Sequence, residues 1–130
     1  LIKVRIGHSK LKENVLKIKQ SCDICGLNHP KLLIASHIKP WAKSDNFEKL
    51  DSANILLLCS MHDALFDKGL ISFDDNGKIL VSKELNKKEQ ALVNINEEIC
   101  IKIVSEKQKQ FLKYHRINKF LNWIVKVVII

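Results

Sequence analysis

The sequence predicts a single α+β domain in which a strand, a long loop, a second strand and a helix follow one another. Two apolar runs, at residues 32–38 and 55–59, have the length of short buried strands and could pair as an antiparallel hairpin. An Asn-Gly dipeptide at 76–77 lies between two further apolar segments and indicates a second hairpin. At 130 residues, the chain is long enough for one domain with a hydrophobic core and too short for two ordinary domains.

Helix signals occur in three places. Among the lysines of residues 3–20, the apolar residues from Leu11 onward have the spacing of an amphipathic helix. Ser60, with an acidic residue three positions later, resembles a capping box, and Gly69 can end the short helix that starts there. Ser105, with a glutamine three positions later, predicts a last helix that continues to about residue 120.

The remaining segments are less regular. The polar stretch at residues 42–53 predicts a long loop with one helical turn, and loops of this length in small domains usually carry function. Residues 99–104 have a strand-like pattern, while residues 84–97 are polar and have no clear pattern. We divide the chain into a helical lead-in at 1–21, a core at 22–82 and a C-terminal strand and helix extension at 83–130.

The charge of the chain points to a class of partner. There are 22 Lys and Arg residues against 14 Asp and Glu residues, which gives a net charge of +8. A basic protein is attracted to polyanions, because binding releases their counterions. Nucleic acid is therefore the first partner to consider. The alternative is a soluble basic protein whose lysines only solvate a helix face.

No secretory signal or membrane span is predicted. The longest apolar stretch, residues 121–130, has only ten residues and includes Asn122 and Lys126, so it cannot cross a bilayer. We expect a cytoplasmic protein without a membrane partner. The sequence leaves the role of the apolar end, residues 122–130, open between a docking strand, a dimer contact and residues foreign to the natural protein. The start at Leu1 rather than Met is compatible with a piece of a longer protein.

Three of the four cysteines fall in closely spaced, metal-type pairs. Two residues separate Cys22 from Cys25, and two separate Cys59 from His62. Zn²⁺ binds four thiolate and imidazole ligands tetrahedrally, so these residues predict a structural zinc site. Thiols used in this way indicate a reducing compartment. The alternative is that the cysteines are buried apolar thiols, as we expect for Cys100, and that His62 serves elsewhere.

These pairs belong to an ordered set of four motifs: Cys22-Asp23-Ile24-Cys25-Gly26, Ala35-Ser36-His37-Ile38-Lys39-Pro40-Trp41, Asn54-x4-Cys59 and His62-Asp63-Ala64-Leu65-Phe66-Asp67-Lys68-Gly69. The set resembles the HNH endonuclease family, and more narrowly its restriction-type branch. The resemblance covers about residues 5–82 and extends weakly to residues 111–116. It implies a ββα-metal core, also called the His-Me finger, with a zinc-knuckle-like Cys and His staple, flanking helices and a following β-hairpin.

The resemblance also implies roles for His37 and Asn54. His37 would be the general base that deprotonates the attacking water, a task that needs a near-neutral pKa. From its position alone, it is a histidine at the end of a strand that bonds a local carbonyl. Asn54 would bridge the loop through its amide, which offers a donor and an acceptor, and so hold His37 in place. From its position alone, it is a turn residue.

The ligands of a catalytic metal are open between two assignments. In the first, His62 completes the zinc site, and Asp63 and Asp67, four apart on one helical face, bind Mg²⁺ or Mn²⁺, with Zn²⁺ or Ni²⁺ as the alternative ions. In the second, His62 is itself a catalytic ligand and the cysteines form an incomplete zinc site. We favour the first, because the spacing after Asn54 then matches zinc-bearing members of the family. Ser36 stands where many members have an acidic ligand, and serine is a poor one.

We therefore predict a metal-dependent endonuclease that hydrolyses DNA phosphodiester bonds, either a restriction-type enzyme or its nuclease domain. The metal would stabilise the charge of the phosphate as a Lewis acid. Two copies that meet on a duplex, as a homodimer, would give double-strand breaks. The alternative is a zinc-stapled DNA-binding module that has lost catalysis. The residues expected to contact DNA are Lys39, Trp41, Lys43 and Lys68.

Overall fold

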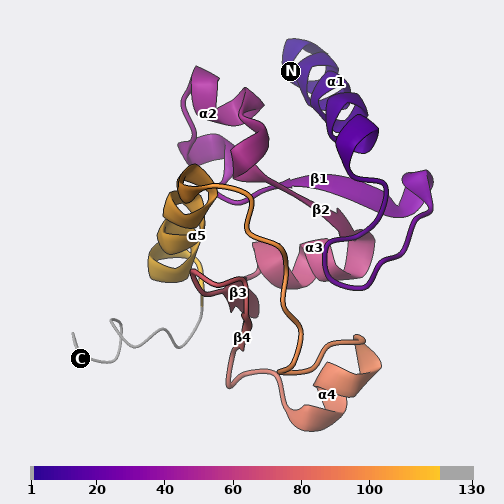
Figure 1. Cartoon of the computed structure of the whole chain (residues 1–130), viewed down its shortest axis with the longest axis vertical. Coiled ribbons are helices and arrows are strands. Elements are labelled where there is room, and N and C mark those ends of the chain that lie inside the picture. Colours follow the sequence, from indigo (N-terminus) through magenta and orange to yellow (C-terminus); the bar gives the residue numbers. More distant parts are fainter. Residues whose placement is uncertain (1, 121–130) are drawn as a thin grey trace.

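The computed structural model describes residues 2–120, with side chains from Lys10 onward, so the apolar segment 121–130 lies outside the described residues. Figure 1 shows α1 and α2 at one end of the molecule, α4 at the other, and the hairpins with α3 and α5 between them. The elements in chain order are α1 (Ile2–Ile18), η1 (Pro30–Leu32), β1 (Leu33–His37), η2 (Trp41–Lys43), α2 (Asn46–Leu50), η3 (Ser52–Asn54), β2 (Ile55–Cys59), α3 (Ser60–Asp67), β3 (Ile71–Phe73), β4 (Ile79–Val81), α4 (Lys87–Leu92) and α5 (Glu106–Asn118), where η denotes a 3₁₀ helix.

The first hairpin lies at the centre of the fold. β1 pairs with β2 in antiparallel register, with Leu33 opposite Cys59 and His37 opposite Ile55. Every residue of β2 is buried, as its continuous apolar sequence predicts. α3 follows β2 without an intervening loop and packs against both strands. The predicted order of strand, loop, strand and helix, and with it the α+β class, is confirmed.

α3 is short and amphipathic. The helix begins at Ser60, so its N-cap residue is Cys59 and not Ser60 as the sequence suggested. Gly69 follows its end with a φ of +73°, a left-handed conformation that glycine adopts without strain. The buried side chains have the spacing of one helical face: His62, Leu65 and Phe66.

The segment between β1 and β2 is more ordered than the predicted loop, because it contains α2 and two 3₁₀ helices. Asp45 caps α2: its carboxylate accepts a hydrogen bond from the backbone N–H of Glu48 at 2.8 Å. The Glu48 carboxylate in turn accepts from the N–H of Asp45 at 2.9 Å. This capping box satisfies N–H groups that a helix start leaves without partners. A five-residue helix is thereby held next to the end of the hairpin.

The predicted second hairpin is confirmed, since β3 pairs antiparallel with β4. Gly77 in its turn has a φ of +86°, and a Cβ atom there would lie 2.0 Å from the carbonyl oxygen of Ile101. Only glycine fits this conformation and this approach. Residues 99–104, expected to form a strand, make an isolated bridge between Cys100 and Lys78, because the segment then leaves β4 for the start of α5. Cys100 is exposed, so its expected burial was wrong.

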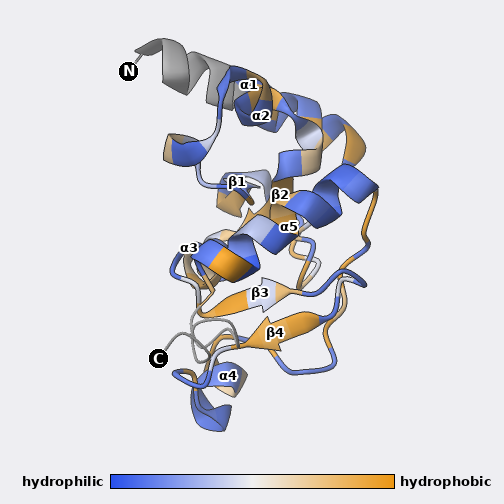
Figure 2. Cartoon of the chain, turned by 90° about the vertical axis from the view of Figure 1, so that its left-hand side faces the viewer, coloured by the Kyte–Doolittle hydropathy of each residue, from blue (hydrophilic) through white to orange (hydrophobic). Residues whose placement is uncertain are grey.

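Two further helices complete the fold. α4 lies in the segment 84–97, where the sequence had no clear pattern, and a second capping box between Asn86 and Glu89 starts it. α5 begins as predicted, because the Ser105 hydroxyl accepts a hydrogen bond from the N–H of Gln108 at 3.1 Å. Figure 2 shows that the outer side of α5 is mainly hydrophilic. None of the described helices has the length and apolar character needed to span a membrane.

A buried histidine joins α5 to the core. His115 stacks on Phe66 of α3 with ring centroids 3.8 Å apart, and its Nε2–H donates to the carbonyl of Phe66 at 2.9 Å. Because Nε2 carries the hydrogen, Nδ1 accepts from the hydroxyl of Ser72 at 2.8 Å. Burial lowers the pKa of His115 to about 4, although the hydrogen bond to Phe66 acts in the opposite direction. The ring is therefore neutral at neutral pH.

Candidate functional site

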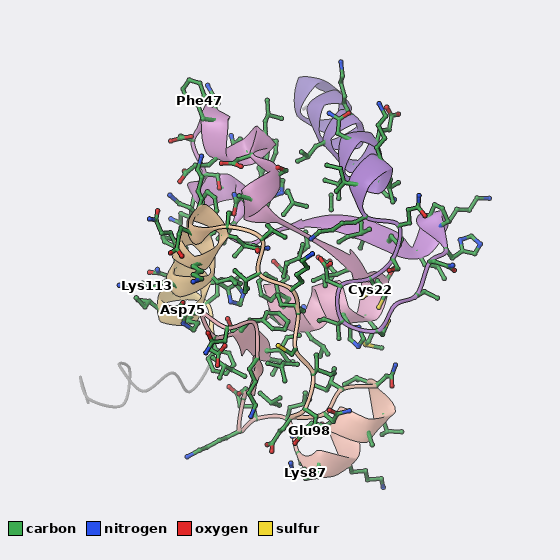
Figure 3. The ribbon with its side chains drawn as sticks, viewed as in Figure 1. Cys22, Phe47, Asp75, Lys87, Glu98 and Lys113 are labelled. Atoms are coloured by element: carbon green, nitrogen blue, oxygen red, sulfur yellow. The ribbon has the colours of Figure 1, made fainter. Side chains whose placement is uncertain are left out.

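Two segments bring the three predicted cysteine ligands and His62 together. The turn after α1 carries Cys22 and Cys25, and the N–H of Gly26 donates to the carbonyl of Cys22 at 3.0 Å. Cys59 ends β2, and His62 lies in the first turn of α3. Figure 3 shows Cys22 beside α3. The four ligand atoms all lie within 4.8 Å of one another, and we call this group the Cys₃His cluster.

The Cys₃His cluster has the geometry of a metal site. Nδ1 of His62 lies 3.4 Å from Sγ of Cys59 and 3.7 Å from Sγ of Cys22. Sγ of Cys25 lies 4.0 Å from Sγ of Cys59. Nε2 of His62 donates its hydrogen to the carbonyl of Val93 at 3.0 Å, so the lone pair of Nδ1 faces the sulfur atoms. Metal-bound histidines usually donate their second N–H to a carbonyl or carboxylate in this way.

The electrostatics of the cluster favour an anionic thiol. Burial raises the pKa of Cys22, but its interaction with His62 and hydrogen bonds from backbone N–H groups lower it to about 6. Burial raises the pKa of Cys25 to about 11, and the nearby Cys22 adds to this. Burial lowers the pKa of His62, but its interactions with Cys22 and the Val93 carbonyl outweigh burial and raise it. A buried thiolate next to an imidazole is a pair of ligands that a metal cation stabilises.

Three sulfurs and one imidazole nitrogen fit a tetrahedral zinc ion. This is one of the usual donor sets of structural zinc, in which all four ligands come from the protein. Among residues 10–120, whose side chains are described, the Cys₃His cluster is the one group of three or more Cys, His, Asp or Glu donors that could hold a metal ion. The fold therefore brings together the four residues that the spacing grouped.

His37 lies at the opposite end of the same hairpin. Because His37 is opposite Ile55 and Leu33 is opposite Cys59, four residue steps of strand separate the two ends. At the usual rise per residue, that is roughly 13 Å. The Cys₃His cluster and His37 therefore lie at opposite ends of the β1–β2 hairpin, well apart from each other.

The loop that follows His37 holds its ring. Nε2 of His37 lies 2.7 Å from the carbonyl oxygen of Lys49. A carbonyl can only accept, so Nε2 carries the hydrogen and the lone pair is on Nδ1. Trp41 packs edge to face against the imidazole with centroids 5.1 Å apart, and Nζ of Lys49 lies 4.8 Å from the Trp41 ring centroid. These contacts fix one tautomer and one orientation of His37.

Asn54 is fully buried at the start of β2. Its Oδ1 accepts a hydrogen bond from the backbone N–H of Lys39 at 2.8 Å, and its Nδ2 donates to the carbonyl of Glu48 at 3.1 Å. The amide therefore connects the part of the loop just after His37 with the part just before Lys49.

The residues expected to bind a catalytic metal are not gathered into one group. His62 is 1% exposed and faces the cysteines, and both assignments stay predictions. Consecutive helical residues point about 100° apart, so Asp63 faces a different direction from His62. The side chain of Asp67 is 70% exposed and lies 3.9 Å from Nζ of Lys119. Asp63, half-buried, is the remaining carboxylate, and Ser36 is buried in β1.

The residues expected to contact DNA differ in their surroundings. Lys43 and Lys68 are exposed. Lys39 is half-buried, and its Nζ lies 3.0 Å from each carboxylate oxygen of Glu48 and 5.1 Å from the ring centroid of Tyr114. Its ammonium group therefore has partners within the protein, and its expected phosphate contact stays a prediction.

Sequence reasoning missed several groups that hold these side chains. The carbonyls of Lys49 and Val93 orient two histidines, and they leave no signal in a sequence because every residue has a carbonyl. Glu48 could have been found, because Asp45 stands three residues before it in a capping-box pattern. The contact of Tyr114 with the loop depends on tertiary packing alone.

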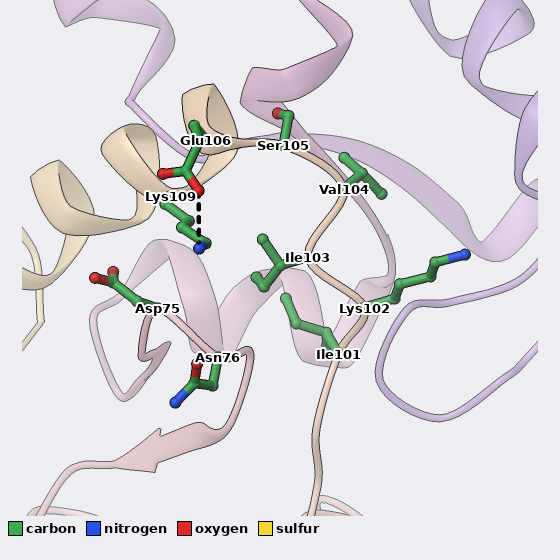
Figure 4. Close-up of a pocket in the computed structure, with 9 residues that line it drawn as sticks. All are labelled: Asp75, Asn76, Ile101, Lys102, Ile103, Val104, Ser105, Glu106 and Lys109. Atoms are coloured by element: carbon green, nitrogen blue, oxygen red, sulfur yellow. Dashed lines mark hydrogen bonds and ion pairs between the residues drawn. The ribbon is translucent and has the colours of Figure 1, made fainter.

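A separate hollow lies between the turn of the second hairpin and the start of α5 (Figure 4). Its lining includes Asp75, Ile101, Glu106 and Lys109. None of the site residues predicted from the sequence lines it. It belongs neither to the Cys₃His cluster nor to the surroundings of His37.

Comparisons with known proteins agree with this geometry. Residues 22–74 match a family model described as HNH endonuclease. The fold is similar to a solved structure entitled "Modification dependent TagI restriction endonuclease", with a TM-score of 0.52 and 22% identity over 88% of this chain. The chain spans only 38% of that protein's length. A comparison with curated proteins gave no match. Residues 22–74 therefore carry a likeness to the HNH endonuclease family, and the similarity to the solved structure shows a shared fold.

Proposed function

We propose that this chain hydrolyses phosphodiester bonds of DNA with His37 as the general base. The observation that carries the proposal is the hydrogen bond from Nε2 of His37 to the carbonyl of Lys49 at 2.7 Å. It puts the hydrogen on Nε2 and the lone pair on Nδ1, the nitrogen that would take a proton from the attacking water. The amide of Asn54 supports this role by bracing the same loop. A base held in one orientation needs no rearrangement when the proton moves.

A divalent metal ion is the second requirement of this chemistry. We propose Asp63 as its protein ligand and Mg²⁺ or Mn²⁺ as the ion, because Mg²⁺ is commonly held by one or two carboxylates together with water and substrate phosphate. When bound, the ion would stabilise the charge that develops on the phosphate. The exposed Asp67 and the hydroxyl of Ser36 are weaker candidates, because Asp67 has Lys119 as a neighbour and serine is a poor ligand.

The Cys₃His cluster would hold a structural Zn²⁺. Its buried donors and the hydrogen bond from His62 to Val93 support this assignment. The ion would join the turn after α1 to the end of β2 and to α3, and so stabilise the hairpin that carries His37. The four cysteines are free thiols, which supports a reducing compartment such as the cytoplasm.

Charge supports DNA as the substrate. The net charge of +8 favours a polyanion, and the exposed Lys43 and Lys68 are suited to phosphate contacts that do not read sequence. The TagI protein is described as a modification-dependent restriction endonuclease. We propose that the present chain is the nuclease part of a restriction-type enzyme, and that two copies acting on one duplex cut both strands.

Plasmid cleavage tests the role of His37. With Mg²⁺, Mn²⁺ or Ni²⁺, the wild-type protein should nick and linearise supercoiled plasmid, and His37→Ala should be slower by a factor of at least about 10². His29→Ala, which changes an exposed histidine near the same strand, should cut at the wild-type rate. Equal rates for the wild type and His37→Ala would reject the base assignment. Parallel reactions on methylated and unmethylated plasmid test dependence on modification.

The second candidate function is a zinc-stapled DNA-binding module without catalysis. One observation favours it: within residues 10–120 there is no second group of three metal donors besides the Cys₃His cluster. Such a module would retard a labelled duplex in a gel and leave plasmid uncut with every metal. Cleavage that His37→Ala abolishes would exclude it.

A further inference from the structure

The C-terminal helix α5 lies outside residues 22–74, which match the family model, yet two of its side chains contact the loop around His37. The Lys107 ammonium forms an ion pair with the carboxylate of Asp51, which precedes η3. The Tyr114 ring lies 5.1 Å from Nζ of Lys39. α5 and η3 also pack against each other. The helix therefore touches the loop on either side of α2.

Asp51 connects the ion pair with Asn54. Its carboxylate accepts from the N–H of Ala53 at 2.9 Å, and its carbonyl accepts from the N–H of Asn54 at 2.9 Å. Its own N–H donates to the carbonyl of Glu48 at 3.3 Å. Burial raises the pKa of Asp51, but the hydrogen bonds from Lys107 and Ala53 outweigh burial and lower it, so the carboxylate is charged at neutral pH. The ion pair thus fixes the turn that carries the Asn54 amide.

Lys39 gives the second connection. Its backbone N–H donates to Oδ1 of Asn54, and its ammonium pairs with the carboxylate of Glu48 at 3.0 Å. The residue after Glu48 is Lys49, whose carbonyl accepts from His37. The Tyr114 ring covers the ammonium of Lys39, a contact that attracts the cation to the aromatic face. The ion pair that closes the loop therefore rests against α5.

We infer that α5 positions the catalytic loop, with Lys107 and Tyr114 as positioning residues that act on His37 through Asp51 and Lys39. Neither Lys107 nor Tyr114 gives a proton to the attacking water or takes one from it. The inference rests on the proposed function where cleavage rates test it, but its test by NMR spectroscopy does not depend on that function. A displacement of the loop loosens the hydrogen bond between His37 and Lys49, and misplacing a catalytic group by about 1 Å can cost roughly 10²-fold in rate.

The most informative variant is Lys107→Met. The Lys107 side chain is 62% exposed, and exposed ion pairs contribute little to stability, so this variant should fold. Lys109→Met is the matched control, because it removes the same charge from the same helix. Lys109 pairs with Glu106 of α5 itself at 3.0 Å and lines the hollow in Figure 4. Lys107→Arg keeps the charge, and Tyr114→Phe keeps the ring that Tyr114→Leu removes.

The zinc-loaded chain of residues 1–130 is assayed in two ways. In plasmid cleavage with Mg²⁺, kcat of Lys107→Met should fall about tenfold, while its KM should change no more than that of Lys109→Met, and Lys107→Arg should restore kcat. In ¹⁵N NMR spectra, the His37 ring should be the Nε2–H tautomer in the wild type and a tautomer mixture in Lys107→Met. The side-chain amide hydrogens of Asn54 should exchange faster in that variant. Tyr114→Leu should behave like Lys107→Met, and Tyr114→Phe like the wild type.

Two results would overturn the inference. The first is equal kcat values and identical His37 and Asn54 signals in Lys107→Met and Lys109→Met. The second is a lower kcat with unchanged NMR signals, which would mean that Lys107 contacts DNA. If the wild type cuts no DNA with any metal, the proposed function fails, and the NMR comparison alone still decides whether α5 positions His37.

Discussion

Three histidines of this chain have their hydrogen placed in the same way. In each, Nε2 donates to a backbone carbonyl, so the lone pair lies on Nδ1. The same hydrogen bond to a carbonyl therefore orients a proposed base, a proposed zinc ligand and a structural histidine. Burial and the neighbouring groups determine which of these roles each histidine has. The pairs are His37 with Lys49, His62 with Val93 and His115 with Phe66.

His115 makes the protein sensitive to acid. Its pKa is about 4 in the folded protein and near 6.5 in the unfolded chain, so the stability it contributes is complete above about 6.5 and is lost as the pH falls toward about 4. Between about pH 7.5 and about pH 5, this should lower the free energy of unfolding by about 2 kcal/mol. Urea unfolding of the wild type and His115→Gln checks it. A variant that loses as much stability as the wild type over this range would contradict the assignment.

At the scale of elements, two glycines with similar backbone conformations have different surroundings. Gly26 has a φ of +79° and would have no atom within 4 Å of an added Cβ. Gly77 has a φ of +86° and would place that Cβ 2.0 Å from the carbonyl oxygen of Ile101. The first position requires only a left-handed backbone. The second also joins the β3–β4 turn to the segment that leads into α5.

Alanine at the two positions separates these effects. Gly26→Ala should lower the free energy of unfolding by about 1 kcal/mol, the cost of a left-handed residue with a Cβ. Gly77→Ala carries the same cost and must also displace the Ile101 backbone, so the loss should be about 3 kcal/mol. Urea unfolding of both zinc-loaded variants measures the difference. Equal losses of unfolding free energy in the two variants would mean that the backbone around Ile101 moves aside without cost.

Local signals in the sequence predicted most of the elements and some of the site. The apolar runs, the Asn-Gly turn and the Ser105 cap predicted both hairpins and α5, because these signals act within a few residues. α4 was missed, and residues 99–104 were taken for a strand, because a pattern of apolar residues does not say whether a neighbouring strand is available. That His62 faces the cysteines while Asp63 points in another direction follows from helix direction and burial, which only the folded chain shows.

On the scale of the whole molecule, the Cys₃His cluster joins the turn after α1 to the end of β2 and to α3. Two hydrogen bonds connect the turn after α1 to β2. The N–H of Asp23 donates to the carbonyl of Leu57 at 2.7 Å, and the N–H of Leu57 donates to the carboxylate of Asp23 at 2.9 Å. The cluster lies next to these bonds. A structural zinc would therefore hold the N-terminal part of the chain on the hairpin, and its loss should loosen both.

Removal of the metal tests this at the level of the fold. The purified chain should contain about one zinc per molecule, and a strong chelator should lower its melting temperature and release the zinc. Cys59→Ser should lose zinc, while Cys100→Ser, which changes the exposed cysteine outside the cluster, should keep it. Zinc content by elemental analysis and thermal unfolding give the two readouts. A Cys59→Ser protein with the zinc content of the wild type would contradict the ligand assignment.

The spacing of the cluster along the chain has a consequence for how the protein matures. Thirty-three residues separate Cys25 from Cys59, and the whole loop around α2 lies between them. Closing so long a loop is entropically costly, and it becomes favourable only once β1 and β2 have paired. Zinc capture should therefore be a late step of folding. We expect the fraction of newly made chains that become stable to follow the supply of exchangeable zinc in the cell, so that metal homeostasis would limit how much of this protein accumulates.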